Sequence, residues 1–223
     1  MGHPLKPTRF PITCLAALLT VALLVACPLR EKSVKPVNVP DTIMVFGSGD
    51  SLAITVHLKG DSLWTFLPGR TVCLPQRPAA SGIRFEDRTA LFWMKGAEAL
   101  FQTPGEKPVS LVSRPDLAVW ERAKLQGWDF RAVGQEPPWE LLIGKGRGIL
   151  LWQGYERRRL EWAYVEPEIQ QNVGVTRYRP ESNVQIELTS AACRDLMSGA
   201  GFNTKVSLEI EGKELLGCGQ PLH

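Results

Sequence analysis

Few side chains of this sequence have the types and spacing that catalysis or metal binding requires. Neither His57 nor His223 has a cysteine or carboxylate partner at metal-ligand spacing. The segment Gly47-Ser48-Gly49 is not a nucleophile elbow, and no glycine-rich loop leads from a predicted strand into a helix, as a phosphate-binding loop requires. His57 falls on the polar face of an alternating strand, which favours a solvated side chain. We therefore expect no catalytic residue, no metal ion and no cofactor, and we expect that the protein is not an enzyme.

A cysteine near the start of the chain has a different chemistry. Lys6 and Arg9 precede an apolar run at residues 11–26, which is the build of a secretory signal and is too short for a stable spanning helix. Residues 24–27, Leu-Val-Ala-Cys, resemble the bacterial lipobox. The resemblance implies that the Cys27 thiol receives a diacylglycerol, that the peptide is cut before it, and that the new amino group is acylated, typically by palmitate. The alternative is an ordinary signal peptide with an incidental cysteine.

The lipobox resemblance also predicts where the protein lies. It implies a signal peptide at residues 1–26 and a lipidated tether at residues 27–41, whose prolines and charges have no apolar period. Residue 28 is Pro rather than Asp, which by resemblance to lipoprotein sorting implies the outer membrane, facing the periplasm. Several acyl chains on one cysteine bind a bilayer firmly. No later stretch approaches the length of a spanning helix, so we expect this lipid anchor to be the membrane contact.

Charge and length exclude some classes of protein. Removing 26 of the 223 residues leaves 197, and removing Lys6 and Arg9 from the 26 basic residues leaves 24, against 23 acidic ones. This balance argues against a nucleic-acid-binding protein, which would show a clustered basic face. The length suits one large β domain or two small ones.

The remaining cysteines predict one disulfide bond. Cys14 would leave with the signal and Cys27 would be lipidated, which leaves three cysteines in an oxidising compartment. Cys193 and Cys218 lie in the same C-terminal region and close a loop long enough for a stabilising bridge. We expect these two to pair, and Cys73 to be a buried thiol in a strand.

The elements that position these residues are mainly β-strands. Short alternating runs separated by Gly and Pro turns fill residues 42–113 and predict a small antiparallel barrel or sandwich. Residues 115–126 have a helical stripe and a Gly stop, so we expect a connecting helix within residues 114–127. Residues 128–223 predict a second β-rich domain, in which residues 191–197 would form a short helix stapled by the disulfide.

The first of these domains resembles the membrane-bound lysozyme inhibitors of the c-type lysozyme class. The resemblance rests on four short motifs in a fixed order: Pro68-Gly69, Leu74-Pro75, Ser81-Gly82-Ile83-Arg84-Phe85 and Trp93-Met94-Lys95-Gly96. It implies a small antiparallel β-barrel that binds c-type lysozyme as a protein partner. It also implies that Ser81 and Lys95 enter the lysozyme cleft and meet the two catalytic carboxylates, of which one is protonated and one ionised. Without the resemblance, Lys95 would be a solvated turn residue.

The second domain resembles an uncharacterised envelope domain, and this resemblance implies no activity. It rests on residues 130–139, 193–198 and 217–219. Glu136, Arg194 and Asp195 are candidates for a polar site there, although a structural salt bridge is the preferred interpretation. The alternative function is therefore a non-enzymatic envelope scaffold or ligand-binding lipoprotein that acts through the C-terminal domain. The sequence does not predict the oligomeric state.

Overall fold

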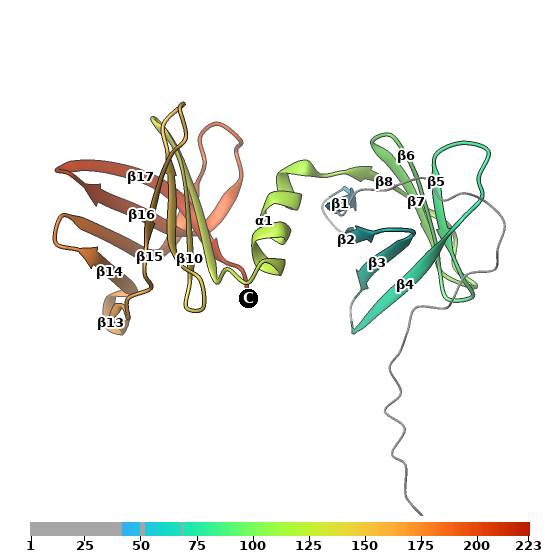
Figure 1. Ribbon diagram of the computed structural model, residues 1–223, viewed down its shortest axis with the longest axis horizontal. Helices are drawn as coiled ribbons and strands as arrows, with labels where there is room; N and C mark the ends of the chain where they lie inside the picture. The colour runs from blue at the N-terminus through green and yellow to red at the C-terminus, as the bar shows by residue number, and fades with distance from the viewer. Residues whose placement is uncertain (1–41, 50–51, 68) are drawn as a thin grey trace, which may run out of the picture.

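The structure, a computed structural model, describes residues 42–49, 52–67 and 69–223, which form two antiparallel sheets joined by a helix (Figure 1). Cys27 and the expected signal peptide and tether lie outside the described residues. Within the described part of the chain, no helix has the length and apolar character needed to cross a membrane.

The first sheet is a closed barrel of eight strands in sequence order. The strands are β1 (Thr42–Ser48), β2 (Leu52–Lys59), β3 (Ser62–Leu67), β4 (Arg70–Arg77), β5 (Ile83–Glu86), β6 (Leu91–Lys95), β7 (Glu98–Gln102) and β8 (Val109–Ser113). Pairing of Phe46 on β1 with Ser113 on β8 closes the barrel and leaves the sheet no free edge. The interior is filled by alternate residues of the strands, with Phe46 and Phe92 in edge-to-face contact at 5.4 Å between ring centroids. The predicted barrel is confirmed.

Helix α1 (Pro115–Leu125) connects the two sheets. It has Pro in its first turn. It ends just before Gly127, the stop that the sequence predicted, which has a left-handed conformation with φ +81°. At its start, the backbone N–H of Arg114 donates to the carbonyl oxygen of Val45 in the barrel, at 2.7 Å. In its middle, the Trp120 ring packs on Phe202 at 5.1 Å, and the Arg131 guanidinium lies 4.2 Å over the same ring. The helix therefore contacts both sheets.

The second sheet has nine strands in the order β12-β11-β10-β9-β17-β16-β15-β14-β13. Their bounds are β9 (Phe130–Gln135), β10 (Pro138–Gly144), β11 (Gly148–Gln153), β12 (Arg158–Trp162), β13 (Glu168–Gln170), β14 (Val175–Glu181), β15 (Val184–Arg194), β16 (Gly201–Ile210) and β17 (Lys213–Pro221), with a 3-10 turn η1 (Gln171–Val173) before β14. The sheet curls around its own core. Tyr164, which follows the edge strand β12, therefore contacts Tyr178 on β14 near the other edge, with 6.2 Å between the ring centroids. The pKa of Tyr178 is raised to about 12, mainly because the phenol is buried and secondly because Tyr164 lies beside it.

The disulfide bond between Cys193 and Cys218 is confirmed and joins β15 to β17. The short helix expected at residues 191–197 is wrong. Strand β15 continues to Arg194, because Cys193 and Arg194 pair with Phe202 and Gly201 of β16. Pairing with a neighbouring strand thus overrides the local helical signal.

Cys73 corrects a second expectation. Its side chain is half-buried on β4, on the side opposite to the barrel core. The residue is disulfide-bonded rather than a free thiol. The expected buried free thiol is therefore wrong.

Candidate functional site

Ser81 and Lys95 lie at the same end of the barrel. Ser81 belongs to the exposed connection at residues 78–82 between β4 and β5, and Lys95 is the last residue of β6. Strands β5 and β6 pair with Ile83 opposite Met94. The next residues toward the barrel end are therefore Gly82, which follows Ser81, on one strand and Lys95 on the other. In Figure 1 this end is at the upper side of the barrel, where β5 and β6 are labelled. Strand pairing therefore brings together two residues that lie apart in the sequence.

Trp93 and Gly82 hold the Ser81 segment against β6. The indole N–H of Trp93 donates to the carbonyl oxygen of Ser81, with a distance of 2.8 Å. Gly82 has φ +70°, and a Cβ atom there would lie only 2.2 Å from the carbonyl oxygen of Met94. Only glycine combines this backbone conformation with so close an approach. Trp93 and Gly82 belong to the sequence motifs, but the sequence analysis did not predict that they position Ser81. The signal that points to them is an exposed Trp on a strand beside a loop that contains Gly.

Lys95 is presented outward at the tip of a hairpin. Phe92 and Met94 are buried on β6, whereas Trp93 and Lys95 point away from the core, as the alternation predicted. The chain turns in two residues, beginning with Gly96 at φ +63°, and returns as β7. Lys95 is opposite Glu98 in the register but forms no ion pair with any described residue.

The Ser81 hydroxyl is likewise exposed, and it forms no hydrogen bond within the described ranges. A hydroxyl donates or accepts a hydrogen bond, and an ammonium group donates three. The arrangement is therefore suited to binding carboxyl groups of a partner at the barrel end. It offers no nucleophile–base pair for catalysis.

The two described histidines, His57 and His223, lie in different parts of the structure. His57 is half-buried on β2 of the barrel, whereas the Nε2 atom of His223 lies 3.1 Å from the carbonyl oxygen of Trp128 in the other part of the molecule. Among the described residues, no group of three or more His, Cys, Asp or Glu side chains has the arrangement to hold a metal ion.

The salt bridge expected from Glu136, Arg194 and Asp195 is not formed within the described residues. Asp195 instead accepts hydrogen bonds from the Gln135 amide and from the backbone and hydroxyl of Ser198. The Nε atom of Arg194 donates to the carbonyl oxygen of Gly199 at 3.1 Å. Burial raises the pKa of Asp195, but these hydrogen bonds outweigh burial and hold the pKa below its ordinary value. The expectation is wrong because nearby amide and hydroxyl donors satisfy the carboxylate.

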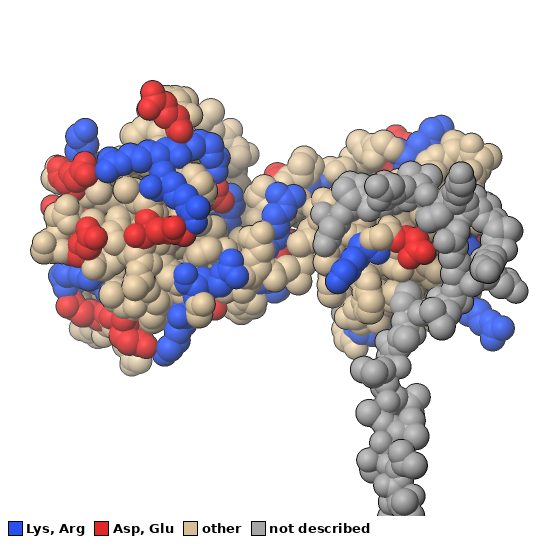
Figure 2. Space-filling model, viewed as in Figure 1, with Lys and Arg blue, Asp and Glu red and all other residues tan. Residues whose placement is uncertain are grey.

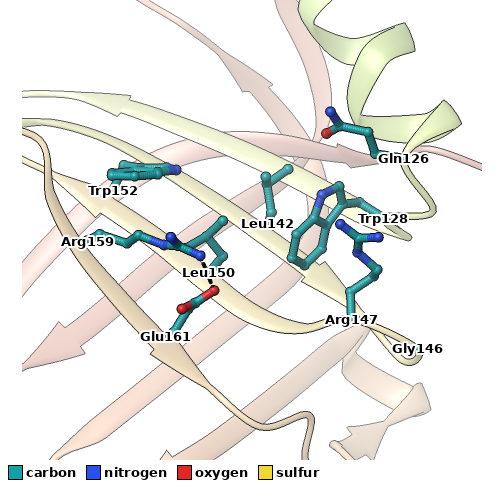
Figure 3. Close-up of a pocket in the computed structure, with 9 residues that line it drawn as sticks. All are labelled: Gln126, Trp128, Leu142, Gly146, Arg147, Leu150, Trp152, Arg159 and Glu161. Atoms are coloured by element: carbon teal, nitrogen blue, oxygen red, sulfur yellow. Dashed lines mark hydrogen bonds and ion pairs between the residues drawn. The ribbon is translucent and has the colours of Figure 1, made fainter.

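The outer face of the second sheet carries a shallow hollow of about 560 Å³ beside the end of α1 (Figure 3). Buried Leu142 and Leu150 are part of its lining. The Arg159 guanidinium lies 5.4 Å over the Trp152 ring and forms an ion pair with Glu161, which offsets its charge. On the face that Figure 2 shows, Lys and Arg side chains of the part that holds the second sheet are interspersed with Asp and Glu. The charged side chains that line the hollow are Arg147, Arg159 and Glu161, so its lining carries both signs of charge.

The closed eight-stranded sheet defines the class of small antiparallel β-barrel proteins. Comparison with known proteins identifies the family. The family model described as "Membrane-bound lysozyme-inhibitor of c-type lysozyme" matches residues 47–110, which lie within the barrel. A protein of Yersinia enterocolitica serotype O:8 / biotype 1B (strain NCTC 13174 / 8081), named membrane-bound lysozyme inhibitor of C-type lysozyme, is 31% identical over 93 residues, which are 42% of this chain and 74% of that relative.

The chain therefore belongs to the family of membrane-bound lysozyme inhibitors of c-type lysozyme. No solved structure matches it significantly. The family match lies entirely before α1, so the second sheet is outside the matched region.

Proposed function

We propose that this protein is an outer-membrane lipoprotein that inhibits c-type lysozyme by inserting the Ser81 loop and the Lys95 hairpin into its catalytic cleft. The observation that carries the proposal is the pairing of β5 with β6, which holds both residues at one exposed end of the barrel. Membership of the family supports the choice of partner.

The chemistry of the partner explains why a lysine and a serine serve as inhibitory groups. Lysozyme cleaves its substrate with one carboxyl group held protonated and a second one ionised. The Lys95 ammonium would pair with the ionised carboxylate, where the substrate develops positive charge. The Ser81 hydroxyl would donate to or accept from the protonated carboxyl group. Both catalytic groups would then be occupied and the cleft closed to substrate.

The shape of the barrel end fits this role. The two-residue turn after Lys95 makes a narrow tip, and the bond from Trp93 to Ser81 fixes the second loop beside it. A site that is ordered before binding loses less conformational entropy when the complex forms. Lys95 also has no ion pair to break within the described residues.

The location is part of the proposal. Acyl chains on Cys27 would anchor the protein in the outer membrane, facing the periplasm, and residues 27–41 would tether it. Residues 42–113 would be the inhibitor domain, residues 114–127 the connection and residues 128–223 a second envelope domain. Lysozyme that crosses the envelope toward peptidoglycan would meet the inhibitor on its route.

The test is a titration of c-type lysozyme activity with the full chain, comparing wild type with Lys95→Ala. Removing one partner of a buried charge pair costs about 2–5 kcal/mol of binding, so we expect roughly 30-fold weaker inhibition or more. Lys107→Ala is the matched control, because Lys107 is an exposed lysine in the β7–β8 connection, at the opposite end of the barrel. The proposal is refuted if wild type does not inhibit, or if Lys95→Ala inhibits as well as wild type and Lys107→Ala.

A further inference from the structure

The turn between β15 and β16 exposes two large apolar side chains in succession. Leu196 is 94% exposed and Met197 is 74% exposed. Such residues are usually single on a protein surface, whereas here two adjacent ones form the tip of a loop. Asp195, which precedes them, is buried, whereas the exposed Arg194 lays its guanidinium along the turn and donates from Nε to the carbonyl oxygen of Gly199.

The loop that carries this pair is held firmly. The Asp195 carboxylate accepts the backbone N–H groups of Met197 and Ser198 at 3.3 and 3.2 Å, and the Gln135 amide at 3.1 Å. The backbone of Asp195 exchanges two further bonds with the far side of the turn, through Gly199 and Ala200, each at 2.9 Å. The Cys193–Cys218 disulfide lies immediately before the turn. Leu196 and Met197 are thus fixed in an exposed position rather than left on a loose segment.

The apolar tip lies on the same side of the molecule as the candidate inhibitory site. In Figure 1 the loop between β15 and β16 and the hairpin after β6 are both at the upper side. Helix α1 links them, because its Trp120 packs on Phe202, the residue that pairs with Cys193 at the base of the loop. The start of the same helix is bonded to Val45 of the barrel.

We propose that Leu196 and Met197 form a second contact with the c-type lysozyme molecule that the barrel end binds. This inference rests on the proposed function. The pair would bury its side chains against an apolar patch beside the lysozyme cleft, and the preformed loop would lose little entropy on binding. A lipid surface is the less favoured occupant, since a membrane on this side would also face the Ser81 and Lys95 end. The second sheet would then add to the affinity that the barrel end provides.

The test uses the full chain in the same lysozyme titration. Leu196→Ser combined with Met197→Ser should raise the concentration needed for half-inhibition about tenfold or more, because two large side chains no longer become buried. The control is Ile169→Ser combined with Val173→Ser, which changes two other exposed apolar residues in β13 and η1, at the lower side of Figure 1. The control should inhibit as wild type does, and both double variants should keep the wild-type melting temperature.

The outcomes separate this inference from the proposed function. If wild type inhibits and Lys95→Ala does not, while the Leu196 and Met197 variant inhibits as wild type does, the second contact is wrong and the barrel mechanism stands. If wild type itself fails to inhibit, both are wrong. Hydrogen exchange gives a direct second readout: the amides of residues 195–200 should exchange more slowly when lysozyme is bound, and unchanged exchange there would overturn the inference.

Discussion

Substituting Gly82 by alanine tests whether the position of Ser81 matters for inhibition. The added Cβ atom would lie 2.2 Å from the Met94 carbonyl oxygen, and real Cβ contacts essentially never fall below 3.0 Å. The segment must therefore move away from β6 by about 0.8 Å or more, the difference between these two distances. That movement strains the bond from Trp93 to Ser81 and displaces the hydroxyl. Losing one hydrogen bond to the partner costs about 1–3 kcal/mol, so inhibition should weaken about 5- to 150-fold.

Gly105→Ala is the matched control. Gly105 also has a positive φ, of +82°, but a Cβ atom there meets nothing within 4 Å, and the residue lies in the β7–β8 connection at the opposite barrel end. Both variants therefore carry the backbone strain of a left-handed alanine, about 1–2 kcal/mol, and only one carries the collision. Lysozyme titration measures the difference in inhibition, and the indole N–H resonance of Trp93 reports the displacement. Equal inhibition by the two variants would refute the claim that the Gly82 contact positions the site.

Two further predictions concern a single hydrogen bond and a single ionisation. Trp93→Phe keeps an aromatic ring on β6 but removes the donor to Ser81, so it should weaken inhibition about two- to tenfold with little change in melting temperature; unaltered inhibition in the titration would contradict this. Tyr178 has a pKa of about 12 in the folded state against 10 when unfolded, because it is buried and lies beside Tyr164. Its stabilisation is fully present below pH 10 and is lost as the pH rises to 12, by up to about 3 kcal/mol. Unfolding free energies measured from pH 9 to 12 should therefore fall more steeply for wild type than for Tyr178→Phe. Parallel curves would show that ionisation of the Tyr178 phenol does not cause the loss of stability.

The barrel was predictable because its signal is local and repeated. Strand β2 alternates buried Ile54, Val56 and Leu58 with outward residues, and similar alternation recurs along the other strands. Helix α1 was predictable from the helical stripe at residues 115–126 and the Gly stop after it. The segment at residues 191–197 was mispredicted because its helical signal is weak, whereas its strand pairing depends on β16, which comes later in the chain. A single-sequence pattern does not contain that partner.

The sequence by itself determined the residue types of the candidate site, its motifs and the pairing of Cys193 with Cys218. It also determined that Lys95 ends a strand and that Gly96 permits a tight turn. Only the tertiary structure decided that Ser81 and Lys95 share one end of the barrel, because their proximity is fixed by the register between β5 and β6. It also decided the role of Gly82, since a distance to the Met94 carbonyl exists only after the strands have paired. Spacing along a chain specifies which face of a strand a residue occupies, whereas contact between strands depends on hydrogen bonds that form when the sheet closes.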